Sequence, residues 1–460
     1  MSDYLPTIGL EIHIELATQT KMFCSSRNDS DEKRPNVNIC PICLGYPGTL
    51  PVINQEAVRS VLRVGLAVGG KVADYTEFDR KNYFYPDIPK GYQISQYKNP
   101  LVNGGELAGV KLTRIHLEED TAKSLHNENS KLKIENSLLD FNRAGVPLME
   151  LVTEPVIKTA TEASDFAREL QLLLKYLNVS GANMEKGEMR VEANISVSNQ
   201  QPTTNNQRLG TKVEVKNLNS FKVVEKAIKF EMKRQIEILE QGERVVQETR
   251  GWDEKKEVTF PQRLKESAHD YRYFPDPDLP ELFVAEIPDF APEALRRAMP
   301  ELPWEKRERY KRDFRLKEGD IEIYVRQPEW GRLLEEVAEI LGNRDLVQLA
   351  SNYITSDLKT PVSAISLAEV VKMISVGEIS SRGAKDILKI IQEKGGEPRT
   401  IANEQNLIQE SDREVLEKIA KEVLRENPEA PIDFLVGQSM KATKGNANPQ
   451  VLKEIFIKIL

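Results

Sequence analysis

The chain has 460 residues, of which 40% are hydrophobic and 30% charged, and its formal net charge is −8. Its apolar runs are too short to cross a bilayer, residues 1–6 lack the basic and apolar regions of a secretory signal, and three cysteines are too few for a disulfide framework. We therefore expect a cytoplasmic protein of roughly three domains. A protein that binds nucleic acid with its whole surface is usually basic, so any RNA would be held by local basic patches, and the charge alone neither supports nor excludes an RNA partner.

The first predicted strand covers residues 8–16, where apolar residues occupy the even positions. The same alternation recurs in residues 190–197 and 212–216. Because side chains of a strand alternate between its two faces, a sheet of these strands packs one face on a core and turns the other outward. The outward face would carry Glu11, His13, Glu192, Asn194, Glu214 and Lys216.

The acidic face of these strands is a candidate metal site. Carboxylates and an imidazole gathered away from water repel one another unless a cation compensates them, and oxygen-rich sites suit Mg²⁺. Residues 114–120, at the end of another predicted strand, add three consecutive acids. The alternative is that the acids only form a solvated strand face.

Cys24, Cys40 and Cys43 are candidate zinc ligands, because Cys40 and Cys43 form a Cys-x-x-Cys pair. A structural zinc site usually needs four ligands. Ser26 stands where a second pair would be completed. The alternatives are a three-thiolate site with an unknown fourth ligand and a knuckle that has lost its metal.

Residues 55–68 have a helical pattern, which Gly69 and Gly70 would end as a C-cap. The spacing from Gly65 to Lys71 imitates a phosphate loop, but Val72 replaces the required Ser or Thr, and no strand precedes the motif. We therefore reject a phosphate-binding loop at this place.

Residues 78–96 are predicted to form a long, fixed loop. Prolines restrict this segment, and rigid loops often position ligands. Aromatic rings interleaved with basic residues can stack a base and hold phosphate, although a packed structural loop would have the same composition. The segment contains three tyrosines and three basic residues, which are Tyr83, Tyr85, Tyr92, Arg80, Lys81 and Lys90.

The remainder of the chain is predicted to be helical. Two prolines in residues 287–292 mark the change, helical patterns follow at 303–315 and 329–341, and Gly395, Gly396 and Pro398 mark a second boundary. Residues 435–449 are rich in small residues and contain two lysines, which suits either approach of a phosphate backbone or a connection between helices.

Together these segments resemble the B subunits of the aspartyl/glutamyl-tRNA amidotransferases. Phe-Asp-Arg-Lys-Asn-Tyr-Phe-Tyr-Pro-Asp at residues 78–87 and Gly-Gln-Ser-Met-Lys-Ala-Thr-Lys-Gly-x-Ala-Asn-Pro at residues 437–449 are highly specific. The similar stretches occur in the expected order across nearly the whole chain, at residues 8–15, 38–51, 78–96, 117–124, 140–155, 210–221, 247–252, 270–277 and 434–449.

The resemblance implies an α+β fold with an antiparallel-sheet cradle domain (1–290), an all-α helical domain (291–398) and a small α-helical tail domain (399–460). The cradle would use ATP and Mg²⁺ to phosphorylate the side-chain carboxylate of Glu-tRNA(Gln) or Asp-tRNA(Asn), and the other domains would hold the tRNA. Ammonia would arrive through a tunnel from an amidase-family glutaminase, the A subunit. The small C subunit would complete a heterotrimer.

The resemblance also implies roles for individual residues. The metal ligands would be Glu11, His13, Glu118 or Glu119, and Glu214, three of which the strand alternation also singles out. Candidates for phosphate contact and catalysis are Lys81, Arg80, Lys90 and Lys216. Candidates for binding nucleotide or substrate are Tyr83, Tyr85, Tyr92, Ser95, Glu192 and Asn194, and those for tRNA are Lys441 and Lys444. Family members that contain zinc carry four cysteines, so Ser26 makes Zn²⁺ uncertain.

Two other functions remain open from the sequence. A tRNA-holding scaffold with a degenerate active site would lack the acidic ligands, and Glu11, His13, Glu119 and Glu214 argue against it. A metal-dependent hydrolase would use the same acids without ATP and would be active as a single chain.

Overall fold

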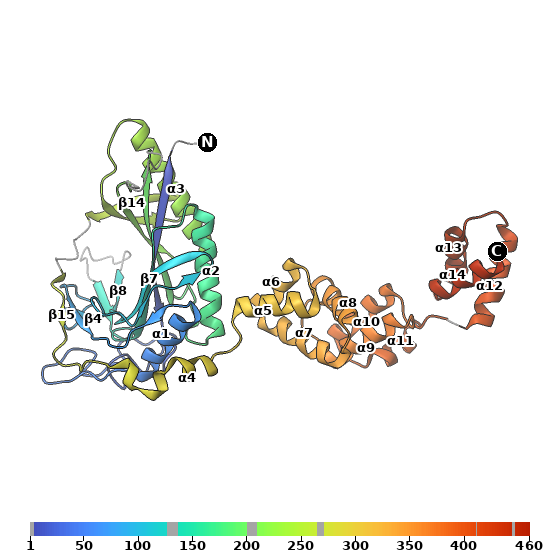
Figure 1. Ribbon diagram of the computed structural model, residues 1–460, viewed down its shortest axis with the longest axis horizontal. Helices are drawn as coiled ribbons and strands as arrows, with labels where there is room; N and C mark the ends of the chain where they lie inside the picture. Colours follow the sequence, from blue (N-terminus) through green and yellow to red (C-terminus); the bar gives the residue numbers. More distant parts are fainter. Residues whose placement is uncertain (1–3, 127–136, 200–208, 265–270, 411, 444–446) are drawn as a thin grey trace, which may run out of the picture. The chain divides into compact units, whose positions relative to one another are not determined.

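A computed structural model describes residues 4–126, 137–199, 209–264, 271–410, 412–443 and 447–460 (Figure 1). The chain divides into two compact units, residues 1–302 and 303–460, each of which is described by itself. The first unit is rich in strands and the second is helical, so the predicted α+β class is confirmed. In the described part of the chain, no helix is long and apolar enough to span a membrane.

The large sheet of the first unit has the strand order β14-β13-β12-β11-β1-β10-β7-β5-β2, with β6 paired to β7. Two smaller sheets have the orders β15-β3-β4 and β8-β9. The strands are β1 (Leu5–Glu15), β2 (Lys71–Val72), β3 (Asp79–Asn82), β4 (Tyr92–Ser95), β5 (Val102–Asn103), β6 (Glu106–Leu107), β7 (Val110–Glu119), β8 (Lys123–His126), β9 (Ser137–Asp140), β10 (Pro147–Thr153), β11 (Met189–Ser198), β12 (Val213–Leu218), β13 (Glu248–Asp253), β14 (Val258–Leu264) and β15 (Phe274–Pro275).

The alternation of β1 explains why the large sheet has one apolar and one polar face. Ile8, Leu10, Ile12 and Ile14 are at most 1% exposed. Helices α2 (Ala160–Tyr176) and α3 (Phe221–Glu240) pack together, and α3 also packs on β11 and β12 (Figure 1). The opposite face is left for the polar residues, as the sequence predicts.

One strand pair departs from the expected antiparallel sheet. The described neighbours in the large sheet are antiparallel except β12 and β13, which are parallel. Helix α3 lies between these two strands in the chain, and a helical crossover returns the chain in the same direction. The predicted antiparallel cradle is therefore a mixed sheet at this edge.

The predicted long loop at residues 78–96 is in part a hairpin. Strands β3 and β4 pair from Asp79↔Ser95 to Asn82↔Tyr92, and β15 pairs with the other edge of β3. Only the proline-containing segment between the two strands is a loop, because proline cannot donate to a strand ladder. The prediction of a loop was therefore wrong for Asp79–Asn82 and Tyr92–Ser95, which are strands.

The remaining described α-helices of the first unit are α1 (Gln55–Ala67) and α4 (Pro292–Arg297), and two short 3-10 turns, Val284–Glu286 and Pro288–Phe290, precede α4. Asn54 caps α1, and Gly69 follows it with φ +68°, as expected of a helix end rather than a phosphate loop. The second unit contains α5 (Pro303–Arg309), a π-helical turn (Tyr310–Phe314), α6 (Glu318–Arg326), α7 (Pro328–Leu341), α8 (Arg344–Ser356), α9 (Ala364–Ser375), α10 (Ser381–Lys394), α11 (Pro398–Glu404), α12 (Arg413–Glu426), α13 (Ile432–Ala442) and α14 (Pro449–Ile459).

Candidate active site

The register of four neighbouring strands builds a row of ionisable side chains across the polar face of the sheet. On β7, β10, β1 and β11 the paired positions are His116↔Glu150, Glu150↔His13 and His13↔Arg190. Directly paired residues in antiparallel strands point to the same face. Backbone pairing therefore brings together residues that lie far apart in the sequence.

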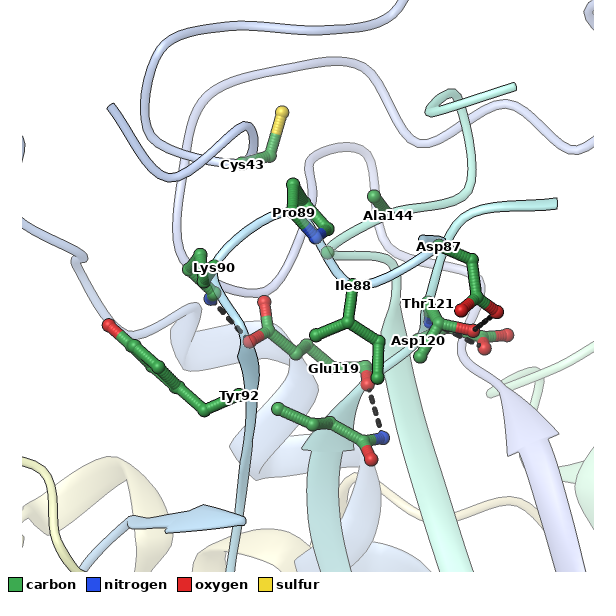
Figure 2. Close-up of a pocket in the computed structure, with 12 residues that line it drawn as sticks. Cys43, Asp87, Ile88, Pro89, Lys90, Tyr92, Glu119, Asp120, Thr121 and Ala144 are labelled. Carbon is green, nitrogen blue, oxygen red and sulfur yellow. Dashed lines mark hydrogen bonds and ion pairs between the residues drawn. The ribbon is translucent and has the colours of Figure 1, made fainter. Parts of the chain in front are cut away.

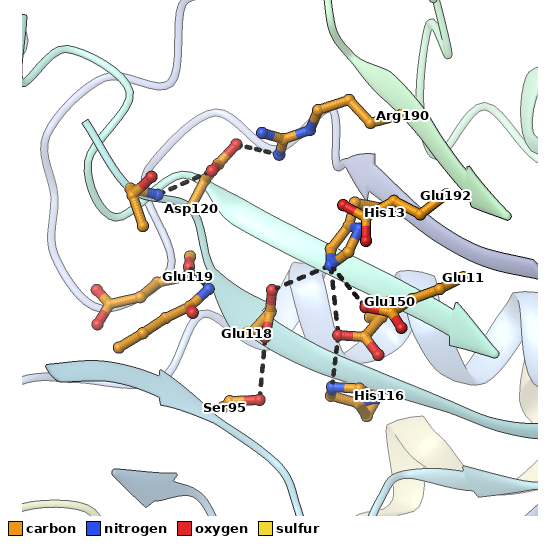
Figure 3. A network of polar contacts seen from close by, with 12 residues as sticks. Glu11, His13, Ser95, His116, Glu118, Glu119, Asp120, Glu150, Arg190 and Glu192 are labelled. Atoms are coloured by element: carbon orange, nitrogen blue, oxygen red, sulfur yellow. Dashed lines mark hydrogen bonds and ion pairs between the residues drawn. The ribbon is translucent and has the colours of Figure 1, made fainter. Parts of the chain in front are cut away.

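Five residues form what we call the acid–imidazole cluster: Glu11, His13, His116, Glu118 and Glu150 (Figure 3). The Nε2 atom of His13 lies 3.4 Å from a Glu150 oxygen, 3.7 Å from Glu118 and 3.9 Å from Glu11. Glu150 also lies 3.4 Å from Nε2 of His116. Glu118 and Glu150 are buried, whereas Glu11 retains partial exposure.

The pKa values in this cluster show a shortage of positive charge. Burial and the charges of Glu150 and Glu192 raise the pKa of Glu11 to about 7. Burial disfavours the His13 cation, but the hydrogen bond and charge of Glu150 prevail and raise the pKa of His13 to about 9. Burial lowers the pKa of His116 to about 4. At neutral pH, His13 is thus the charged partner of Glu150.

A second group of ligands adjoins the first. Carboxylate oxygens of Glu11, Glu192 and Glu214 lie within 4.8 Å of one another and form what we call the carboxylate triad. The neighbouring Asn194 pairs with Glu214 in the sheet, and its Oδ1 atom is buried without a hydrogen-bond partner among the described residues. Glu11 belongs to both groups, so the two ligand sets share one residue.

These residues fit a divalent cation. Mg²⁺ prefers oxygen ligands, and the site supplies several carboxylates. Two buried polar atoms, Nδ1 of His116 and Oδ1 of Asn194, lack partners within the described parts of the chain. The predicted ligands Glu11, His13, Glu118 and Glu214 are thus brought to one face of the sheet.

Glu119 is not brought to this cluster. It follows Glu118 on β7, so its side chain points to the other face. There it forms an ion pair with Lys90 and accepts a hydrogen bond of 2.9 Å from the backbone N–H of Ile94. Glu119 and Lys90 line a pocket together with Cys43 and Tyr92 (Figure 2). Of the two acids proposed as alternatives, the geometry favours Glu118 as the ligand.

The four candidate cations have different surroundings. Arg80 is held by Asp276 at 2.9 Å and Asp278 at 2.8 Å, and Lys216 by Glu192 at 2.7 Å. Lys90 is paired with Glu119.

Lys81 has no carboxylate within ion-pairing distance among the described residues, and its ammonium lies over the rings of Tyr83 and Tyr271. Although burial acts against its charge, the Glu118 carboxylate and nearby tyrosines raise the pKa of Lys81 well above its usual value. Lys81 is therefore the cation best placed to meet an added anion.

The other candidate binding residues lie around these groups. The Ser95 hydroxyl donates to Glu118 at 3.1 Å, and the Tyr83 hydroxyl donates to Gln93 at 2.8 Å. The guanidinium carbon of Arg80 lies over the Tyr92 ring, 4.3 Å from the centroid of that ring. Tyr85 is 45% exposed.

The three cysteines are brought together, with sulfur atoms within 4.8 Å of one another. The buried Lys21 places its ammonium 3.8 Å from the Cys43 sulfur. The hydrogen bond with Cys24 and the charge of Lys21 lower the pKa of Cys43 to about 5, against the effect of burial. Among the described residues, no further histidine, cysteine or acid joins this group, so it has one ligand fewer than a structural zinc site requires.

In the second unit, Lys441 lies on the exposed surface of α13. Lys444 falls outside the described residues. The tail helices enclose a small core of their own, formed by residues that include Leu416, Leu435 and Phe456.

Three site residues, His116, Glu150 and Arg190, were not predicted from the sequence. A single acid inside the otherwise apolar strand Pro147–Thr153 was a usable signal, because an acid is rarely buried without a partner. Arg190 opens the predicted strand at residues 190–197 and lies on the same face as Glu192.

Two family models match the chain. Residues 6–287 match the family model described as GatB/GatE catalytic domain, and residues 335–460 match the GatB domain. Together the two matches define the chain as a protein with a catalytic domain of this class and a helical GatB domain.

Curated relatives of nearly equal length match the whole chain. Proteins named as the B subunit of aspartyl/glutamyl-tRNA(Asn/Gln) amidotransferase are 41% identical in Gloeothece citriformis (100% of this chain, 98% of the relative) and 42% identical in Thermoanaerobacter pseudethanolicus (98% of each). The relative of the same name in Thermotoga petrophila is 41% identical over 99% of each chain. The chain therefore belongs to the family of aspartyl/glutamyl-tRNA(Asn/Gln) amidotransferase B subunits, which confirms the resemblance seen in the sequence.

Proposed function

We propose that this chain is the ATP-dependent subunit of a glutamine-dependent tRNA amidotransferase, a carbon–nitrogen ligase. It phosphorylates the side-chain carboxylate of Glu-tRNA(Gln), Asp-tRNA(Asn) or both, and then directs ammonia to the activated carbonyl. The observation that carries the proposal is the convergence of acids and imidazoles from five strands on one sheet face, with Lys81 beside them.

The reaction has two balanced steps. A carboxylate oxygen of the aminoacyl group attacks the γ-phosphorus of ATP, the bond to the β–γ bridging oxygen breaks, and ADP leaves. The nitrogen of ammonia then attacks the carbonyl carbon of the acyl phosphate, phosphate leaves with the C–O bond, and the nitrogen loses a proton. The amide and inorganic phosphate are the products.

The residues of the site meet the needs of both steps. A carboxylate and a triphosphate repel each other, so the first step needs positive charge at the phosphoryl oxygens. Lys81 supplies one positive charge, and Mg²⁺ held by the acid–imidazole cluster and the carboxylate triad would neutralise the phosphoryl oxygens when bound. Ser95 orients Glu118 through its hydrogen bond. Water must be kept from the acyl phosphate. The buried residues of the acid–imidazole cluster, His116, Glu118 and Glu150, exclude solvent from their side of the site.

The same proposal covers the partner subunits, the domains that bind tRNA and the cellular location of the complex. Ammonia comes from an amidase-family glutaminase, the A subunit, and the small C subunit completes a cytoplasmic heterotrimer. The helical domain (291–398) and the tail domain (399–460) hold the misacylated tRNA, with Lys441 and Lys444 at the phosphate backbone. No zinc-dependent step is part of the proposal.

The direct test is ADP release by the assembled complex. With ATP, glutamine and Glu-tRNA(Gln), we expect one ADP for each glutaminyl-tRNA formed, and no ADP when the tRNA is omitted. Asp-tRNA(Asn) forms a second arm of the experiment. Amidation without ATP, or hydrolase activity of this chain alone, would contradict the proposal.

Metal affinity should rise with pH, because metal ligands must lose their protons before they bind. Without metal, Glu11 has a pKa of about 7 and His13 of about 9. Below pH 7 metal binding releases a proton from each of these two groups, and between pH 7 and 9 it still releases one from His13. We expect Mn²⁺ affinity to increase roughly tenfold per pH unit from 7 to 9, and more steeply below 7.

Titration with Mn²⁺, followed by calorimetry, measures this dependence. Glu11→Gln removes one titrating ligand, so the steeper segment below pH 7 should disappear in that variant. An affinity that stays constant from pH 6 to 8.5, or falls with pH, would show that these two residues are not ligands.

A further inference from the structure

Arg190 extends the row of ionisable residues beyond the metal ligands. It pairs with His13 across β1 and β11, so its side chain starts beside the acid–imidazole cluster on the same face (Figure 3). The cations predicted from the sequence, Arg80, Lys81, Lys90 and Lys216, are not among these paired positions. Arg190 therefore brings a guanidinium group to the edge of the candidate active site.

Asp120 fixes the guanidinium of Arg190. The Nη2 atom of Arg190 donates to Oδ2 of Asp120 at 2.5 Å. Asp120 is only 4% exposed, and its Oδ1 accepts from the backbone N–H of Thr121 at 2.8 Å. Asp120 follows β7 directly, where the backbone N–H of Gly145 donates to its carbonyl at 2.8 Å. The anchor is thus rigid, and it occupies only one edge of the guanidinium.

The Nε–H group of Arg190 remains unused. Its nitrogen is buried, and no acceptor is found for it in the parts of the chain that the structure describes. A buried donor without a partner costs free energy, so such a group commonly marks the place of a ligand or water. Guanidinium groups bind carboxylates and phosphates through paired N–H donors.

Arg143, the second arginine near Asp120, differs from Arg190 in its hydrogen bonds. It also approaches Asp120, at 3.6 Å, but its Nε and Nη2 atoms donate to the backbone carbonyls of Thr121 and Ala122 at 3.0 Å each. These bonds use Arg143 to hold the turn after β7. Of the two arginines that share Asp120, Arg190 is the one whose buried Nε–H has no acceptor among the described residues, and it has a metal-ligand candidate as its neighbour.

We propose that Arg190 is a substrate-binding residue that donates to an anionic oxygen of the reacting groups, with Asp120 as its positioning residue. This inference rests on the proposed function. The anionic oxygen belongs either to the side-chain carboxylate of the aminoacyl group or to the phosphoryl group of ATP. Both present the same chemistry to a guanidinium, and the experiment separates them.

The test compares steady-state kinetics of wild-type complex and four variants with each substrate varied in turn. Arg190→Gln should raise KM for one substrate by about 10- to 100-fold, because a charged hydrogen bond is lost. Arg190→Lys keeps the charge without the paired donors and should give a smaller rise. Asp120→Asn weakens the anchor and should shift the same KM as Arg190→Gln.

Arg143→Gln is the matched control, because it removes an arginine from the same aspartate but leaves Arg190 in place. Its KM values should stay within about twofold of wild type, and circular dichroism verifies that each variant is folded. A rise confined to the aminoacyl-tRNA assigns Arg190 to the carboxylate, and a rise confined to ATP assigns it to the phosphoryl group.

Unchanged KM values for both substrates in Arg190→Gln, or equal effects of Arg143→Gln, would overturn the inference. If the wild-type complex itself fails to form the amide, the proposed function fails instead, so the two failures are distinguishable.

Discussion

Glu11→Ala is expected to lower the rate of acyl phosphate formation on the order of 10³-fold, the loss typical of removing a contact to transition-state charge. Glu11 belongs to both ligand groups, the acid–imidazole cluster and the carboxylate triad. Its removal therefore weakens both sets at once. The affinity for tRNA should stay within about twofold, because Glu11 lies on the sheet of the first unit and not in the predicted tRNA-binding helices.

Single-turnover ADP formation and a separate tRNA-binding measurement test this expectation. Unfolding should not be the cause of lost activity, because burial and the charges of Glu150 and Glu192 raise the pKa of Glu11 above its value of 4.5 in the unfolded chain. Above pH 7 the ionised carboxylate opposes folding, and replacing it relieves that cost.

Glu154→Ala is the control for Glu11→Ala. Glu154 follows β10, and its side chain accepts a hydrogen bond from Thr113, at 2.8 Å, in an exposed pair. Its removal should leave both readouts nearly unchanged. Equal loss of ADP formation and tRNA affinity in Glu11→Ala would count against a metal-binding role.

Glu150→Gln is expected to lower the free energy of unfolding by about 3 kcal/mol, the usual result of removing one partner of a buried charged pair. Although burial opposes its ionisation, His116 and His13 hold the pKa of Glu150 well below its usual range. The variant removes the nearest counter-charge of the His13 cation, at 3.4 Å, and leaves only the more distant Glu118 and Glu11, at 3.7 Å and 3.9 Å. Activity should fall as well, because Glu150 lies at the centre of the acid–imidazole cluster, 3.4 Å from Nε2 of both His13 and His116.

The loss of stability in Glu150→Gln should depend on pH. A lowered acid pKa stabilises the fold above the unfolded value of 4.5, and a raised histidine pKa stabilises it below the unfolded value of 6.5. The pair therefore contributes most between pH 4.5 and 6.5, and its contribution declines as pH approaches the His13 pKa of about 9.

Urea unfolding of metal-free protein at pH 6 and pH 8.5 measures this difference. Glu154→Gln on the neighbouring surface should change stability by less than about 0.5 kcal/mol. A Glu150→Gln variant as stable as wild type at pH 6 would show that the buried pair with His13 does not form.

Alternation along single strands was enough to predict which residues of β1, β11 and β12 share a face. It could not predict the strand order or the register, which depend on pairings between segments far apart in the chain. His116 and Glu150 reach His13 only through that register. Glu118 and Glu119 could not be told apart until the direction of each side chain on β7 was known.

Composition also could not show which cations are already neutralised. Arg80, Lys90 and Lys216 have acidic partners from other segments, whereas Lys81 lies among tyrosines. The Lys81 ammonium lies over the rings of Tyr83 and Tyr271, and Tyr271 comes from a segment almost 190 residues further along the chain. Such neighbours are set by the fold, so the sequence could name candidate cations but could not rank them.

In the proposed active site, acids and imidazoles of separate strands hold a divalent cation beside the nucleotide. Anomalous diffraction from crystals of the complex with ADP and Mn²⁺ tests it most directly. A manganese peak within coordination distance of Glu11, His13 and Glu150 is the predicted result. Nucleotide and manganese bound together at another place, with these three residues free of metal, would contradict it.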